Sequence, residues 1–390
     1  MAMTRTGLVR KLLLGALAVV FLAAAGKSFY DHRHLQEPVV LGPGVTRVTT
    51  LAEYNATIRG TANDANIYIL EGKEPGGTVF VFGGTHPEEP AGRLAAWLIV
   101  EQATIERGRL IVALSANRSA STVTRPSAAY PATYTIPTAW GGQTFRMGDR
   151  FTNPLDQWPD PEVFIHYPSG QYLAYVDVRN LNRAFPGRPN GTLTERTTYA
   201  FMELIRREKV DVAIDLHEAE LQYPVINTIV THQKGQDMAT MVSMTLTDLE
   251  GFQIGTEFSP LNLHGLTHRE IGDHSQAVSL LFEAPEPFLD ATRGRTNADV
   301  LLSGRDEFVV KAGRHGLLFA PIDETGWPIA LRVGRHTSSV AQTLDTWSED
   351  NPDRAIVARG IPRYADLVKH DVGHFLRDPR QAPRDRVVYE

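Results

Sequence analysis

The chain has 390 residues, of which 42% are hydrophobic and 22% charged, and both fractions are ordinary for a globular protein. They exclude a disordered, collagenous, coiled-coil or polytopic membrane protein as a description of the whole chain. The net charge of −6, from 39 Lys and Arg against 45 Asp and Glu, argues against a general nucleic-acid-binding protein. Because the chain has no cysteine, thiolate metal sites, cysteine nucleophiles and disulfides are excluded, and any metal ion must be held by His, Asp or Glu.

The N-terminus has the layout of a secretory signal peptide. Three basic residues precede an unbroken apolar run, 12–25, which ends in Ala23-Ala24-Ala25, an A-x-A cleavage pattern. The alternative is an uncleaved membrane anchor, but the 14 apolar residues fall short of the ~20 that span a bilayer. We therefore expect residues 1–25 to be a signal peptide and the protein to be exported, periplasmic or secreted. The mature chain is then not expected to insert stably in a membrane.

The rest of the chain alternates between strand and helix patterns. Short apolar runs rich in β-branched residues predict strands at 78–84, 110–114, 210–216, 225–230 and 277–282. Apolar residues at helical spacing predict helices at 88–107, 194–208, 236–249 and 296–313. This alternation predicts an α/β domain with a mixed, largely parallel sheet flanked by helices.

The domain boundaries follow from the segments that lack this alternation. Residues 26–75 are predicted to form an extended N-terminal lead-in, and the α/β domain is predicted to cover 76–319. Within it, 117–178 holds many prolines and aromatic residues and is predicted to be a long irregular insertion. Residues 320–390 show weak periodicity and are left as a C-terminal extension.

The first candidate site directly follows the 78–84 strand, in a Gly-Gly-Thr-His-Pro-Glu-Glu sequence. His86 and Glu89 are three residues apart at the start of a predicted helix, a spacing that aims both side chains at one point. An imidazole and a carboxylate together suit Zn²⁺. The alternative is a helix N-terminus at which acidic residues are favoured by the helix dipole.

The second candidate is Asp215-Leu216-His217, at the end of an apolar strand. Strand alternation places Asp215 and His217 on the same side. In open α/β sheets, ligands bind beyond the carboxyl ends of strands. His217 would complete a His–Glu–His metal site, and Asp215 would orient an imidazole or lie near an attacking water. The alternative is a strand-end histidine that is hydrogen-bonded to Asp215.

Two further motifs supply an anion clamp and a general base. Asn182 and Arg183 precede a Phe-Pro-Gly turn and can hold a carboxylate through a guanidinium and an amide. Glu283 follows the 277–282 strand, where poor solvation raises a carboxyl pKa towards the range of a general base. Glu286 is the rival base, and a surface role is the alternative for each of these residues.

Together these motifs form the inventory of a hydrolytic zinc site. Their order, H-x-x-E, then N-R-x-F-P-G, then D-x-H, then a late glutamate, resembles the zinc carboxypeptidase superfamily. The G-G-T-H-x-x-E, L-N-R-A-F-P-G and D-L-H blocks look most like its succinylglutamate desuccinylase/aspartoacylase branch. The resemblance covers about residues 77–290.

The resemblance implies a role for each motif residue. One Zn²⁺ per chain would be held by His86, Glu89 and His217, and Glu283 would be the general base and acid. Asn182 and Arg183 would hold a substrate carboxylate. The family also uses an arginine to polarise the scissile carbonyl, for which Arg179 is the first choice and Arg118 the second.

The sequence therefore predicts an exported zinc-dependent amide hydrolase acting on a carboxylate-bearing substrate. An N-acyl amino acid is one such substrate, and a C-terminal residue of a peptide or cell-wall fragment is the alternative. A second alternative is a non-catalytic exported binding protein, and a third is a surface protein in which zinc only stabilises the fold. The remaining histidines of the region, His264, His268 and His274, are expected to be ordinary loop residues rather than a second metal site.

Overall fold

The computed structural model describes residues 5–124, 130–289 and 293–390. It divides into an N-terminal unit that ends at Gln36 and a main unit, Glu37–Glu390. The described part of the N-terminal unit is dominated by helix α1, Arg5–Arg33. The helix is longer than the predicted apolar run, and an 18-residue window in it has a mean hydropathy of 2.1. By length and composition it meets the requirements of a membrane span, which signal sequences near an N-terminus also meet. Residues 1–4 of the predicted signal peptide and 125–129 of the predicted insertion lie outside the described residues.

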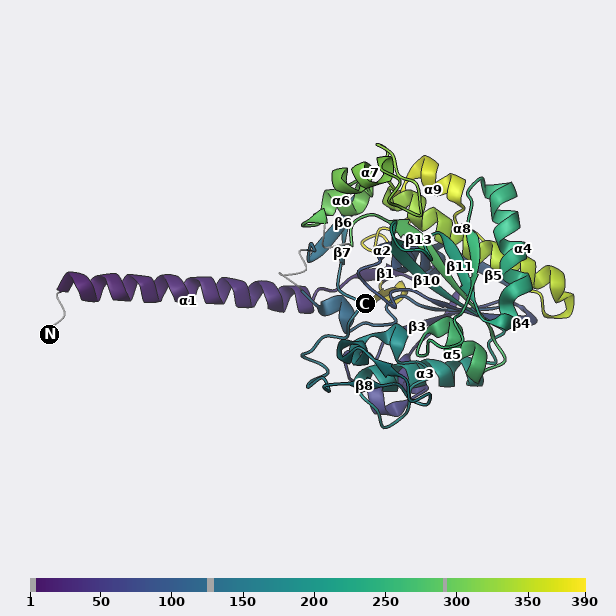
Figure 1. Ribbon diagram of the computed structural model, residues 1–390, viewed down its shortest axis with the longest axis horizontal. Helices are drawn as coiled ribbons and strands as arrows, with labels where there is room; N and C mark the ends of the chain where they lie inside the picture. The colour runs from purple at the N-terminus through teal and green to yellow at the C-terminus, as the bar shows by residue number, and fades with distance from the viewer. Residues whose placement is uncertain (1–4, 125–129, 290–292) are drawn as a thin grey trace. The chain divides into compact units, whose positions relative to one another are not determined.

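A nine-stranded mixed sheet forms the centre of the main unit (Figure 1), which confirms the predicted fold class. Its strand order is β12-β11-β13-β10-β4-β5-β3-β2, and β14 pairs with β5 beside this path. The central strands β13, β10, β4 and β5 are parallel to one another. Strands β3 and β14 pair antiparallel with β5, and β2 pairs antiparallel with β3. The strands are β2 Val45–Thr50, β3 Asn66–Glu71, β4 Glu74–Phe82, β5 Thr104–Ala113, β10 Val212–Glu220, β11 Thr228–Thr231, β12 Gly255–Phe258, β13 Val278–Glu286 and β14 Val357–Arg359.

Helices cover both faces of this sheet (Figure 1). The helices of the main unit are α2 Pro90–Gln102, α3 Leu193–Arg207, α4 Gln236–Thr245, α5 Thr267–His274, α6 Ala298–Ser303, α7 Glu307–Arg314, α8 Ile329–Asp350, α9 Tyr364–His370 and α10 Val372–Phe375. Helices α2, α4 and α8 pack on one face and α3 and α5 on the other. Three short pairings lie outside the main sheet: β1 Pro38–Val40 with β15 Val387–Tyr389, β6 Thr133–Thr138 with β7 Gly141–Arg146, and β8 Phe164–Ile165 with β9 Tyr172–Leu173.

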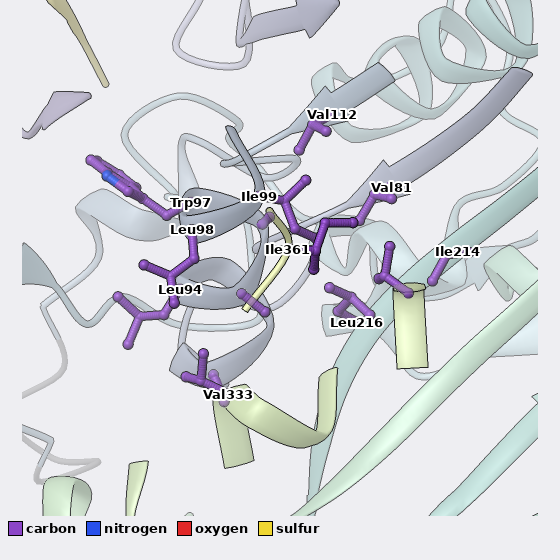
Figure 2. Packing of buried hydrophobic residues seen from close by; sticks show 14 of the residues in the cluster. Val81, Leu94, Trp97, Leu98, Ile99, Val112, Ile214, Leu216, Val333 and Ile361 are labelled. Atoms are coloured by element: carbon purple, nitrogen blue, oxygen red, sulfur yellow. The ribbon is translucent and has the colours of Figure 1, made fainter. Parts of the chain in front are cut away.

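The alternation of strand side chains explains why β4 is apolar without interruption. Val79 and Val81 belong to the core under α2 and α8, whereas Phe80 and Phe82 belong to the core under α3. A strand that is covered on both faces needs apolar residues at every position. Figure 2 shows the first of these cores, in which Leu94 and Leu98 of α2 lie near Val333 of α8.

The observed elements differ from the prediction mainly at their ends. The helix predicted at 88–107 ends at Gln102, because β5 already begins at Thr104 and pairs with β14 there. The helix predicted at 296–313 is two helices, α6 and α7, separated at Gly304, whose φ of 59° ends α6. The 117–178 insertion contains the β6–β7 and β8–β9 pairs.

The segment 320–390 is part of the main unit. Its longest helix, α8, packs on α2 and contributes Val333, Val340 and Leu344 to the core. Many of its other buried residues are polar, namely Arg332, Arg335, His336, Thr337, Ser338, Ser339, Gln342, Thr343 and Thr346. This polarity hides the helical period in the sequence, since apolar residues alone do not mark the buried face.

Candidate active site

The turn after β4 brings the H-x-x-E motif against strand β10. Gly84 has a φ of 66°, a left-handed conformation that glycine adopts without strain. The chain then enters α2 at Pro90, a favoured first helical residue. A Cβ on Gly92 would lie 2.3 Å from the carbonyl oxygen of Leu216, so α2 approaches the β10 backbone more closely than a side chain would permit. The 86–89 turn is therefore fixed beside the end of β10.

Three buried side chains meet at this point. The Nδ1 atom of His86 lies 2.7 Å from Oε1 of Glu89, and Nδ1 of His217 lies 2.9 Å from Oε2 of Glu89. One ligand atom from each residue lies within 4.8 Å of the other two. The structure thus brings together the three predicted metal ligands.

Each imidazole is held from its opposite edge. His86 Nε2 lies 2.9 Å from Oδ1 of Asn180, and His217 Nε2 lies 2.9 Å from Oδ2 of Asp215. These oxygens favour a proton on each Nε2, which leaves both Nδ1 atoms as the metal-binding nitrogens on the side of Glu89. Two neutral imidazoles and one carboxylate match the donor set of catalytic zinc sites.

The charges around the cluster favour a cation. Burial alone would raise the pKa of Glu89, but His86 and His217 hold it well below its ordinary value. Burial would lower the pKa of His217, but the carboxylates of Asp215 and Glu89 raise it well above its ordinary value. The surroundings that favour a proton on His217 would equally favour a metal ion, so the residues fit Zn²⁺.

Asp215 lies beside His217 at the edge of the cluster, and its removal should weaken metal binding. Its carboxylate also accepts hydrogen bonds from the hydroxyls of Thr85, at 2.8 Å, and Thr267, at 2.7 Å. Replacing it with Asn removes the charge that orients His217, and we expect the affinity for zinc to fall about 10- to 100-fold. Competition with a chromophoric chelator measures this affinity. Asp273→Asn, a change outside the cluster, is the control, and equal affinities in both variants would contradict the assignment.

The pocket beside the cluster has a volume of about 460 Å³ and contains the predicted base. Glu283 pairs in register with His217 across β10 and β13, so it lies within β13 rather than after it. Its Oε2 has no hydrogen-bond partner among the described residues. Burial raises the pKa of Glu283 to about 8, the carboxylates of Glu89 and Asp215 add to this shift, and His217 opposes it.

The rival base, Glu286, has a structural role. It is the last residue of β13 and is fully buried, and its Oε2 accepts hydrogen bonds from the backbone N–H groups of Phe288 and Leu289. It is not among the residues that line the pocket. Glu283 therefore has the better position for a base.

Asn182 and Arg183 line the same pocket. Oδ1 of Asn182 accepts a hydrogen bond from the Thr267 backbone at 2.8 Å, which leaves its NH₂ group for a ligand. Nη1 of Arg183 donates to the carbonyl oxygen of Asn182 at 2.7 Å. Within the described residues, Arg183 has no ion pair with a carboxylate, and burial lowers its pKa. A half-buried guanidinium without a counterion is suited to bind an anion.

The structure does not bring Arg179 to the pocket. Its Nε donates to the Asp160 carboxylate at 2.8 Å and its Nη1 to the carbonyl oxygen of Thr152. Arg118, the second choice, is also absent from the pocket lining. The arginine that lines the pocket beside the cluster is Arg150. Its Nε lies 2.6 Å from Oε1 of Glu88 and its Nη2 lies 3.7 Å from Oε1 of Glu89.

Sequence reasoning missed Arg150 because it lies in the long insertion. A Cβ on Gly148 would lie 2.7 Å from Cβ of Pro87, so the loop that carries Arg150 packs directly on the H-x-x-E turn. No local pattern reports a contact between segments more than 60 residues apart in the chain. The sequence signal was an arginine two residues after Gly148, in a segment of functional composition.

The three remaining histidines of this region divide between two places. His268 and His274 lie on helix α5 and not in a loop, and His268 lines the pocket. His264 and His274 both contact the carboxylate of Glu270, at 2.8 and 3.1 Å. His166, His264 and Glu270 have ligand atoms close enough for a metal ion. Hydrogen bonds also join His264 to Glu270 and His166 to Ser169 and the Phe185 carbonyl oxygen, so the absence of a second metal site stays a prediction.

The comparisons with known proteins concern the fold. No family model and no curated protein sequence matches the chain. A succinylglutamate desuccinylase from a Silicibacter species matches at 17% identity and a TM-score of 0.33, over 56% of this chain and 53% of that one. A succinylglutamate desuccinylase/aspartoacylase from Rhodobacter sphaeroides matches at 17% identity and a TM-score of 0.35, over 67% and 62% of the two chains. A metallo-carboxypeptidase from Burkholderia cenocepacia matches at 12% identity and a TM-score of 0.44, over 83% and 68%.

The chain spans about half the length of the Silicibacter protein and less than two thirds of the Rhodobacter protein. Because the identities and TM-scores are low, the function is inferred from the geometry of the site itself.

Proposed function

We propose that the protein is a zinc-dependent hydrolase of amide bonds in substrates that bear a free carboxylate. The observation that carries this proposal is the composition of one pocket. His86, Glu89 and His217 provide the metal-binding set, Glu283 lies beside them, and Arg183 lies free of any counterion in the described structure. Each group alone has a structural explanation, but their convergence matches the requirements of amide hydrolysis.

The residues of the chain divide the chemical work between them. A zinc ion bound by the three ligands would act as a Lewis acid and supply a water of lowered pKa. Glu283 takes the proton from the attacking water and then delivers it to the leaving amine. The guanidinium of Arg183 and the amide of Asn182 hold the substrate carboxylate, which sets the position of the scissile bond.

Arg150 is assigned the polarisation of the scissile carbonyl. It is the arginine of the pocket that lies beside a metal ligand, because its Nη2 is 3.7 Å from Oε1 of Glu89. The carboxylate of Glu88 fixes its guanidinium through Nε and leaves the Nη side to the pocket. A fixed cation stabilises the negative charge that develops on the carbonyl oxygen in the transition state.

A matched pair of variants tests this assignment. We expect Arg150→Met to lower kcat about 100- to 1,000-fold, because a preorganised cation is removed from the developing charge. Arg179→Met should retain most of the activity, since Asp160 holds that guanidinium away from the pocket. Steady-state kinetics on the same substrate compare the two. The opposite ranking would restore Arg179 to the role that the family resemblance implies.

The substrate is proposed to be an N-acyl amino acid, with a peptide or cell-wall fragment as the second candidate. Two exposed side chains of the pocket lining, Tyr223 and Phe258, favour the second candidate because they offer apolar surface to a longer chain.

We further propose that the protein is exported, because α1 has the length and composition of a signal sequence or membrane anchor.

The proposed function is tested with acetyl-amino acids and acetyl-dipeptides assayed for released amino acid on zinc-loaded protein. Release from acetyl-amino acids identifies a deacylase, and faster release of the C-terminal residue from dipeptides identifies a carboxypeptidase. Zinc binding without hydrolysis of either class would leave the binding protein or the zinc-stabilised surface protein as the function.

A further inference from the structure

One histidine of the pocket has no role in the proposed chemistry. His268 is 4% exposed, lies on α5 and lines the pocket. Its Nδ1 is fully buried without a hydrogen-bond partner. Within the described residues, no hydrogen bond reaches either ring nitrogen. A buried polar group without a partner costs free energy, so one in a binding pocket indicates a ligand group that pairs with it.

Part of the pocket lining to which His268 belongs is apolar. Val230 and Leu281 face each other in register across β11 and β13. Leu263 and Leu266 form the adjoining wall, and all four line the pocket. This wall adjoins the carboxylate clamp, because a Cβ on Gly265 would lie 2.1 Å from the carbonyl oxygen of Arg183. A substrate held by Arg183 would thus have its neighbouring side chain close to this apolar wall, in the pocket that His268 also lines.

Burial favours the neutral form of this imidazole. Burial lowers the pKa of His268 to about 3, and the nearby His217 and Arg183 contribute to the shift. A neutral ring offers one donor and one acceptor but no positive charge. Arg183 is already engaged by the first carboxylate of the substrate, and Glu257 also lines this pocket. Arg150, the other arginine of this lining, is paired with Glu88. A second carboxylate at the apolar part of the wall would therefore be desolvated without a free cation.

We propose that His268 determines specificity for a leaving amino acid whose side chain is largely apolar and carries one neutral hydrogen-bonding group. A phenol or an alcohol fits this description, whereas the side chains of aspartate and glutamate do not. The inference rests on the proposed hydrolase function and names its substrate class. It applies equally to the amino acid released by a deacylase and to that released by a carboxypeptidase.

The test compares substrates that differ by one group. Acetyl-tyrosine is compared with acetyl-phenylalanine, acetyl-threonine with acetyl-valine, and acetyl-glutamine with acetyl-glutamate. In the wild-type protein we expect kcat/KM to be at least about 10-fold higher for the first of each pair. This is the effect expected from gaining one buried hydrogen bond or from not burying one charged group. His268→Phe should reduce the tyrosine-to-phenylalanine ratio to about one, and His268→Gln should restore part of it.

His336→Phe is the matched control. His336 is as deeply buried as His268 and has an unpartnered Nε2, but it does not line the pocket. This variant should keep the wild-type tyrosine-to-phenylalanine ratio. An unchanged ratio in His268→Phe, an equal fall in the His336→Phe control, or a wild-type preference for glutamate would overturn the proposal.

Product binding separates this inference from the proposed function. The affinities of free tyrosine and free phenylalanine are measured by calorimetry on the wild-type and His268→Phe proteins. In one outcome no substrate is hydrolysed, but the wild-type protein binds tyrosine about 10-fold more tightly than phenylalanine and the variant does not. The hydrolase function then fails and the pocket assignment stands. If hydrolysis proceeds without either preference, the pocket assignment fails alone.

Discussion

Replacing Glu283 with Gln should lower kcat about 100- to 10,000-fold while the protein keeps its zinc. The change preserves the size of the side chain and removes the group that accepts and returns the proton. Glu283 is not one of the three residues that form the metal-binding group, so the metal content should match that of the wild-type protein. Steady-state kinetics together with metal analysis of the same preparation measure both quantities.

The control for this variant is Glu286→Gln. Glu286 is on the same strand and is also an acid of raised pKa, but it caps a turn outside the pocket. Its replacement should affect stability more than turnover. Near-normal activity of Glu283→Gln, or a larger loss of kcat in Glu286→Gln, would remove Glu283 from the mechanism.

The largest expected loss of stability comes from Glu37, at the start of the main unit. Its fully buried carboxylate accepts two hydrogen bonds from the Arg93 guanidinium, at 2.7 and 2.8 Å. It also contacts Nη2 of Arg146 at 2.8 Å. Glu37→Ala leaves two buried guanidinium groups without this partner, and we expect the free energy of unfolding to fall by about 3–5 kcal/mol. Chemical denaturation of the two proteins at pH 7 measures the difference.

The pH dependence gives an independent check on the same residue. Burial would raise the pKa of Glu37, but Arg93 and Arg146 lower it below its ordinary value of 4.5. Its stabilisation is therefore present above pH 4.5 and is lost as the pH falls through the lowered pKa. The stability difference between wild type and Glu37→Gln should shrink over that acid range. Glu324→Ala, which removes an exposed and solvent-screened carboxylate, should show a much smaller pH-dependent difference. A pH-independent gap for Glu37→Gln would refute the argument.

The parts of the site that were predictable from sequence are those set by local geometry. His86 and Glu89 are three residues apart at a helix start, and Asp215 and His217 are two apart on a strand. The helical period therefore puts the first pair of side chains on one face, and the strand period does the same for the second pair. The apolar strands around them were recognisable because the central sheet is covered on both faces. These local rules also place the pairs at neighbouring strand ends, where they meet.

The parts that could not be predicted depend on contacts distant in sequence. Arg150 reaches the site only because its loop packs on Pro87. Helix α8 was left unpredicted because its buried face is largely polar; Arg332, for example, forms a fully buried ion pair with Glu218. The end of α2 was misplaced because β5 pairs there with β14, about 250 residues later in the chain.

The central claim is that His86, Glu89 and His217 bind a catalytic zinc ion. The most direct measurement is the metal content of the full chain, purified without added metal, beside that of His86→Ala. We predict about one zinc per wild-type chain and a large loss of zinc in the variant, because one of three protein ligands is missing. No zinc in the wild-type protein after reconstitution, or an equal zinc content in both proteins, would contradict the account.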